Sequence, residues 1–113
     1  MDDLLVERVL LAVEQIPPGR VASYGLIASL VGTGPRQVGR IMREYGSFVP
    51  WWRVTSAAGD LSGQLLDAAR PHWDAEGIAV KPNGLGCRYA DHAMDAAELA
   101  AAYHAASARL GEG

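Results

Sequence analysis

Hydrophobic residues near the start of the chain recur every three or four positions, which is the spacing of one helical face. This pattern predicts a first amphipathic helix over residues 3–16, and the Pro-Pro-Gly sequence at 17–19 should end it because proline cannot continue a helix. Ser23 can cap a second, shorter helix over Tyr24–Val31. The hydrophobic positions behind these predictions are Val6, Val9 or Leu10, Val13, Ile16, Ile27, Leu30 and Val31.

The helix predicted over Pro35–Tyr45 is expected to have two chemically different faces. At about 100° per residue, its hydrophobic side chains fall within about 100° of one another, and three arginines gather within about 60° on the opposite side. Two helices joined by a short glycine-containing turn, the second carrying an arginine row, are typical of a helix-turn-helix. The hydrophobic set is Val38, Ile41, Met42 and Tyr45, and the arginines are Arg36, Arg40 and Arg43.

The middle of the chain predicts a small hairpin followed by a further helix. Residues 48–55 mix aromatic and β-branched side chains and are expected to enter a strand. A turn at 57–60 leads to Leu61, which should start the return strand of the hairpin, or wing. Helical spacing resumes over 65–76, where Pro71 is expected to shorten or kink the helix.

The last part of the chain predicts a loop over 81–86 and an alanine-rich helix from Asp95 onward, with Asp95 and Glu98 as a capping pair. We expect an α/β, mostly α, winged helix-turn-helix domain over residues 1–90 and a helical extension over 91–113. The side chains expected on one side of the last helix are Leu99, Tyr103, Ala106 and Leu110.

Composition limits the classes of protein that the chain can belong to. Its 113 residues suit one domain, and half of them are hydrophobic while a fifth are charged, which favours an ordinary soluble core. The longest uncharged stretch, residues 21–35, is too short and too polar to span a membrane. The acidic start of the chain gives no sign of a secretory signal, and Cys87 as the single cysteine excludes an intrachain disulfide. We therefore expect a cytoplasmic protein.

The charge is distributed unevenly along the chain. The net charge is −3, yet residues 19–55 carry +4 and the remainder carries −7. Such asymmetry is typical of a local anion-binding face on an acidic molecule, although scattered surface arginines remain an alternative. The charged residues of this segment are Arg20, Arg36, Arg40, Arg43, Arg53 and Glu44.

Four ordered sequence blocks resemble one known family. They are IPPGRVASYGLIA at 16–28, PRQVG at 35–39, PWWRV at 50–54 and GDLSG at 59–63. Together they resemble the DNA-binding domain of the O6-alkylguanine-DNA alkyltransferases, over about residues 4–77. The resemblance implies the winged helix-turn-helix fold of that domain and binding to duplex DNA through the minor groove.

The third block departs from the family at its reactive residues. The alkyltransferase motif is Pro-Cys-His-Arg-Val, whereas this chain has Trp51 and Trp52 in place of the cysteine and the histidine. Tryptophan at the cysteine position marks the alkyltransferase-like proteins, which bind alkylated guanine without repairing it and pass it to nucleotide-excision repair. Glu76 matches the carboxylate that orients the missing histidine.

The chemistry of the replacement also argues against an enzyme. Alkyl transfer requires an activated nucleophile such as a thiolate, whereas an indole N–H is only a hydrogen-bond donor. Cys87, far beyond the motif, is the one remaining thiol. We expect no cofactor, and no metal site because the histidines share no spacing with acidic or cysteine partners. The histidines are His72, His92 and His104.

The resemblance implies roles for individual residues. Tyr24 would press on the phosphate 3′ to the target nucleotide and help to rotate it out, and Arg36 would fill the space that the nucleotide leaves. Met42 would pack against the extruded base. With the arginine row added, the predicted DNA-binding residues are Tyr24, Arg36, Arg40 and Arg43. The predicted lesion pocket consists of Tyr24, Met42, Pro50, Trp51, Trp52, Arg53 and Val54.

Several of these residues have simpler interpretations. Trp51 and Trp52 can be core aromatics, and Tyr24 can be a packing residue at a helix start. Arg40 and Arg43 can contact phosphates or be ordinary surface residues. The family usually has a Tyr- and Gly-rich lid after the fourth block, but here the chain leads almost directly into a helix. A shortened lid predicts a more open pocket.

The sequence therefore predicts a monomeric, non-enzymatic protein that recognises O6-alkylguanine in duplex DNA by nucleotide flipping. Its expected partners are DNA carrying the lesion and nucleotide-excision repair proteins, without a membrane. One alternative is a helix-turn-helix regulator or architectural protein that has lost lesion recognition. Another is a residual enzyme that uses Cys87.

Overall fold

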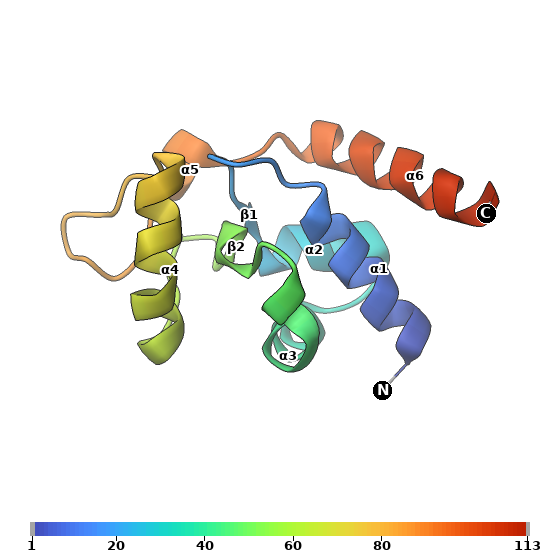
Figure 1. The fold of residues 1–113 in the computed structure, drawn as a ribbon, viewed down its shortest axis with the longest axis horizontal. Helices are drawn as coiled ribbons and strands as arrows, with labels where there is room; N and C mark the ends of the chain where they lie inside the picture. The colour runs from blue at the N-terminus through green and yellow to red at the C-terminus, as the bar shows by residue number, and fades with distance from the viewer. Residues whose placement is uncertain (1, 113) are drawn as a thin grey trace.

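The helices of this protein surround one very short sheet (Figure 1). The computed structural model describes residues 2–112. Two single-turn 3-10 helices, η1 and η2, lie between the third and fourth α-helices. The elements are α1 Asp3–Glu14, β1 Ala22–Ser23, α2 Tyr24–Val31, α3 Pro35–Tyr45, η1 Gly46–Phe48, η2 Trp51–Arg53, β2 Val54–Thr55, α4 Gly63–Glu76, α5 Tyr89–His92 and α6 Ala96–Glu112.

The first three helices follow the hydrophobic pattern of the sequence, and each has a physical start signal. The Asp2 side chain accepts a hydrogen bond from the N–H of Leu4 at the start of α1, which ends two residues before the predicted limit. Ser23 caps α2 as predicted, by accepting from the N–H of Leu26 at 3.0 Å. Pro35 is the first residue of α3.

The predicted hairpin is wrong in its pairing. β2 pairs in parallel with β1, with Ala22 opposite Val54. Because Trp51–Arg53 form a 3-10 turn, only two residues remain extended before a tight turn that places the N–H of Ser56 on the carbonyl oxygen of Asp60. Asp60 then bridges Gly86, not the strand before the turn. The mostly helical α/β class is confirmed, while the sheet joins distant segments of the chain.

α4 begins at Gly63, two residues before the predicted start, and continues through Pro71 to Glu76. The expected shortening at Pro71 is therefore wrong. Pro71 cannot donate a hydrogen bond to the carbonyl of Asp67, but both residues are exposed, so water can satisfy that carbonyl. The helix is anchored instead by Trp73, which is fully buried in a second apolar cluster beside the main core.

The C-terminal helix packs against α1 and completes the main core. Leu99 is fully buried there, and Tyr103 is largely buried. The segment before α6 is hydrogen-bonded on both sides of Val21, whose N–H donates to His92 and whose carbonyl accepts from Met94. Leu110 shares the side of α6 predicted from helical spacing, but it is 68% exposed. The domain boundary at residue 90 stays a prediction.

Among residues 2–112, none of the helices combines the length and the apolar character that crossing a membrane requires.

The burial of Leu99 predicts that α6 stabilises the whole domain. Leu99→Ala should lower the free energy of unfolding by about 2–5 kcal/mol, because it leaves a cavity between α1 and α6. The exposed Leu110 on the same helix is the matched control, and Leu110→Ala should change stability by less than about 0.5 kcal/mol. Urea unfolding followed by circular dichroism measures both. Equal losses in the two variants would contradict this packing.

Candidate functional site

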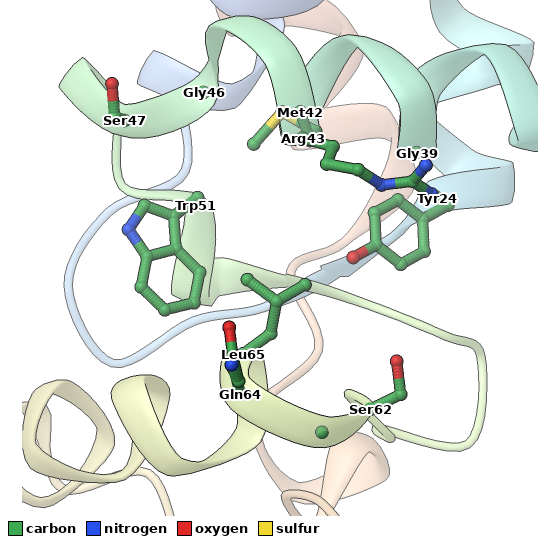
Figure 2. Close-up of a pocket in the computed structure, with 11 residues that line it drawn as sticks. Tyr24, Gly39, Met42, Arg43, Gly46, Ser47, Trp51, Ser62, Gln64 and Leu65 are labelled. Carbon is green, nitrogen blue, oxygen red and sulfur yellow. The ribbon is translucent and has the colours of Figure 1, made fainter.

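A cavity of about 700 Å³ opens between α3 and the first turn of α4. Figure 2 shows α3 on one side, the start of α4 facing it, and Trp51 between them at one end. The residues that line the cavity are Tyr24, Gly39, Met42, Arg43, Gly46, Ser47, Trp51, Ser62, Gly63, Gln64 and Leu65.

Three residues of the predicted lesion pocket line this cavity. They are Tyr24 at the start of α2, Met42 on α3 and Trp51 in η2. Arg43, predicted only as a DNA contact, lines it as well. Sequence reasoning missed Gly39 on α3 and Gly46 and Ser47 in η1. It also missed the stretch from Ser62 to Leu65, although the shortened lid at that point was the signal that could have found it.

The other four residues of the predicted pocket do not line the cavity. Val54 is fully buried in the main core, and Arg53 turns toward Glu76. Trp52 stacks on His72, and Pro50 lies before the turn. The reason is the 3-10 conformation of η2, in which successive side chains point about 120° apart. One residue of the turn can therefore face the cavity, and in this chain it is Trp51.

Trp51 is half-buried, forms one wall of the cavity and packs against both apolar clusters. Its ring meets the rings of Trp52 and His72 edge-on, with centroid separations of 5.8 Å and 5.9 Å. Trp52 is also half-buried, and both rings pack against the second apolar cluster, so the interpretation of the two tryptophans as core aromatics is supported in part. The fully buried tryptophan is Trp73.

Tyr24 lies at the opposite end of the cavity, beside Arg43 (Figure 2). Burial raises the pKa of Tyr24, and the positive charge of Arg43 opposes this only in part. The phenol is therefore neutral at physiological pH and can donate a hydrogen bond. The α2 cap is supplied by Ser23, so Tyr24 is not itself the capping residue.

The three arginines of α3 are exposed, as the helical spacing predicts, and Arg43 lies at the edge of the cavity. Arg40 forms an ion pair with Glu44 at 3.3 Å, and since both side chains are exposed this pair contributes little stability. Arg36 and Arg43 form no ion pair with any residue in the range 2–112. Their charges are available to an external anion.

Glu76, at the end of α4, connects residues 50–54, called here the motif segment, to α4 and to the loop after α1. Its carboxylate accepts hydrogen bonds from the Trp52 indole at 2.8 Å, the Arg53 guanidinium at 2.7 Å and the Gly19 N–H at 3.0 Å. Arg53 also donates to the carbonyl of Ile16 at 2.8 Å. Glu76 matches the carboxylate that orients the histidine in the alkyltransferases. In this chain it accepts a hydrogen bond from Trp52, which stands at the position of that histidine.

These hydrogen bonds set the ionisation of Glu76. Burial alone would raise its pKa, but the hydrogen bonds from Arg53, Gly19 and Trp52, together with the charge of Arg53, lower it below the ordinary value of 4.5. The carboxylate is ionised at neutral pH and compensates the Arg53 charge, with only 13% and 11% of the two side chains exposed.

The described residues offer little for covalent or metal chemistry. Cys87 is fully buried in the second apolar cluster, outside the cavity lining, and burial raises the pKa of its thiol. Its reactive thiolate form is thus disfavoured at neutral pH. Within the part of the chain that the structure describes, no three His, Cys, Asp or Glu side chains are grouped as metal ligands.

Comparisons with known proteins match most of the chain. Residues 5–81 match the family model of the 6-O-methylguanine DNA methyltransferase DNA-binding domain. A DNA base-flipping protein of Vibrio parahaemolyticus is 38% identical over 90 residues, which cover 74% of this chain and 89% of that protein. Alkyltransferase-like protein 1 of Schizosaccharomyces pombe is 35% identical over 83 residues, covering 66% of this chain and 77% of that protein.

A solved structure shows the same fold. It is S. pombe Atl1 in complex with damaged DNA containing O6-carboxymethylguanine, and it superposes with a TM-score of 0.67 at 32% identity. The match covers 77% of this chain and 88% of the S. pombe chain.

The lowered pKa of Glu76 predicts how stability depends on pH. The charged carboxylate stabilises the fold fully above its ordinary pKa, and this contribution is lost as pH falls through the lower folded value. Glu76→Gln should reduce the free energy of unfolding at pH 7 by about 2–4 kcal/mol, because Arg53 keeps a buried charge without a partner. It should also remove part of the stability loss between about pH 5 and pH 3.

Urea unfolding at pH 7, 5, 4 and 3 measures this effect. Asp67→Asn, at an exposed carboxylate on the same helix, is the control and should follow the pH dependence of the unmodified protein. A Glu76→Gln variant with an unchanged pH profile would show that the carboxylate does not stabilise the fold.

Proposed function

We propose that this chain, which belongs to the family of the 6-O-methylguanine DNA methyltransferase DNA-binding domain, recognises O6-alkylguanine in duplex DNA and does not repair it. The observation that carries the proposal is the open cavity beside the arginine face of α3, with Trp51 in its wall. At the position where the resemblance expects a reactive cysteine, the chain has a large aromatic surface.

The size and lining of the cavity suit an extruded, alkylated base. Pockets that enclose small ligands have volumes of about 300–1,000 Å³, and this one has about 700 Å³. Trp51, Met42 and Leu65 supply apolar surface, and burying the alkyl group there contributes about 25 cal/mol per Å². Contact between the base and an aromatic ring can contribute a further 1–3 kcal/mol, roughly. An unmodified guanine lacks the alkyl contribution.

Tyr24 and the arginines of α3 suit nucleotide flipping. Extruding a base costs a few kcal/mol, and less where pairing is already weakened by damage. Arg36, at the start of α3, would occupy the vacated space, while Tyr24 would press on the neighbouring phosphate. Arg40 and Arg43 would contact the DNA backbone. The relative named as a DNA base-flipping protein and the Atl1 complex with damaged DNA support this proposal.

Binding without transfer follows from the chemistry of the wall. The Trp51 indole does not attack an alkyl carbon, and the one thiol, Cys87, is buried outside the cavity. A lesion that is bound but unrepaired has to be passed on. We therefore propose that the protein acts as a monomer in the cytoplasm, on the nucleoid, and marks the lesion for nucleotide-excision repair proteins.

The proposed role of Arg36 predicts a loss of lesion binding. A duplex with one O6-methylguanine should bind at least about ten times more tightly than the matched unmodified duplex, and Arg36→Ala should remove most of this preference. Fluorescence anisotropy with labelled duplexes measures both affinities. Arg109→Ala, at an exposed arginine on α6, is the control and should keep the preference. Equal binding of both duplexes by the unmodified protein would favour a helix-turn-helix regulator instead.

The absence of alkyl transfer is tested by mass. After incubation with excess O6-benzylguanine, and separately with the O6-methylguanine duplex, the intact mass of the protein should be unchanged. A gain equal to a benzyl or methyl group, located on Cys87 by peptide mapping, would revive the enzyme hypothesis. Denatured protein, in which the thiol is exposed, controls for nonspecific alkylation.

A further inference from the structure

We propose that Trp52 and His72 form a positioning pair that holds Trp51 and the first turn of α4 at a fixed separation across the cavity, and so determines lesion selectivity. This inference rests on the proposed function and adds to it. Neither residue lines the cavity, so both would act through the residues that do.

The two rings form the closest aromatic contact of the described residues. The ring centroids of Trp52 and His72 lie 3.8 Å apart, and the ring planes differ by only 8°. Trp51 meets both rings nearly at right angles, with interplanar angles of 86° and 79°. Edge-on contact, as Trp51 makes with both rings, is a preferred geometry of aromatic side chains. The stacked pair therefore fixes the plane of the Trp51 ring that forms the cavity wall.

Trp52 is held by hydrogen bonds as well as by the stacking of its ring on His72. Its indole N–H donates to Glu76, and its backbone carbonyl accepts from the Trp73 indole at 2.7 Å. The Arg53 guanidinium carbon lies 5.4 Å from the centre of the Trp52 ring. Since Glu76 and Trp73 both belong to α4, Trp52 attaches that helix to the motif segment.

His72 links Trp52 to the part of α4 that lines the cavity. It lies seven residues after Leu65 on α4, which is two helical turns, so both side chains lie on the same face of the helix. Leu65 lines the cavity opposite α3 (Figure 2). Fixing His72 against Trp52 therefore fixes the rotation of α4 that directs Leu65 into the cavity.

Loss of the Trp52–His72 stack should allow Trp51 and the first turn of α4 to move relative to each other. A small adduct such as a methyl group needs close contact with both sides, so its recognition depends most on their separation. We expect His72→Ala to reduce the preference for the O6-methylguanine duplex over the unmodified duplex by about three- to ten-fold, the range of one aromatic pair. His72→Phe keeps a flat ring and should restore the preference.

Two measurements separate positioning from a general structural role. His72 is exposed on α4, so His72→Ala should keep the melting temperature within a few degrees and bind the unmodified duplex as before. His104→Ala, at an exposed histidine on α6, is the matched control and should keep the full lesion preference. The variants are compared by anisotropy titration with both duplexes, alongside thermal unfolding.

The outcomes distinguish this inference from the function on which it rests. Selective loss in His72→Ala with recovery in His72→Phe supports the positioning pair. If the unmodified protein prefers the lesion and His72→Ala keeps the full preference, the pair is overturned while the proposed function stands. If the unmodified protein shows no preference, both are overturned. A parallel loss for both duplexes would assign His72 to general DNA contact and overturn positioning.

Discussion

The ion pair between Glu76 and Arg53 is the constraint on which the candidate site depends. It joins the end of α4 to the motif segment, and the hydrogen bonds to Gly19 and Ile16 add the segment that follows α1. Two charges that are almost removed from water must be paired closely, so the partners can move only together. This carboxylate therefore helps to fix the position of the cavity wall relative to α4.

The longer α-helices could be predicted from the sequence, whereas α5, the two 3-10 turns and the pairing of the sheet could not. Helical spacing and caps are local signals, so residues near Ser23 and Pro35 were enough to find α2 and α3. The parallel pairing of Val54 with Ala22 joins segments far apart in the chain and involves two residues on each side. A pattern of β-branched and aromatic residues indicates an extended segment but does not identify its partner.

The candidate site could likewise be predicted only in part. Tyr24 and Trp51 were found through sequence blocks and Met42 through the position that it shares with the family, and all three line one cavity. Arg53 and Val54 belong to the same block but face other directions, because the 3-10 turn directs Arg53 away from Trp51 and Val54 already lies in the buried strand β2. The stretch from Ser62 to Leu65 was missed although the shortened lid was a signal in the sequence, because the sequence alone does not show which of these residues face the cavity. The functions of all these residues stay predictions.

The packing of α6 on α1 has a consequence during synthesis on the ribosome. α1 is translated first, yet its apolar face is completed by Leu99 and Tyr103 near the other end of the chain. A nascent chain that has released α1, α2 and α3 therefore still exposes apolar surface. Assembly of the finished domain waits for the final helix to emerge, and until then this surface is available to chaperones.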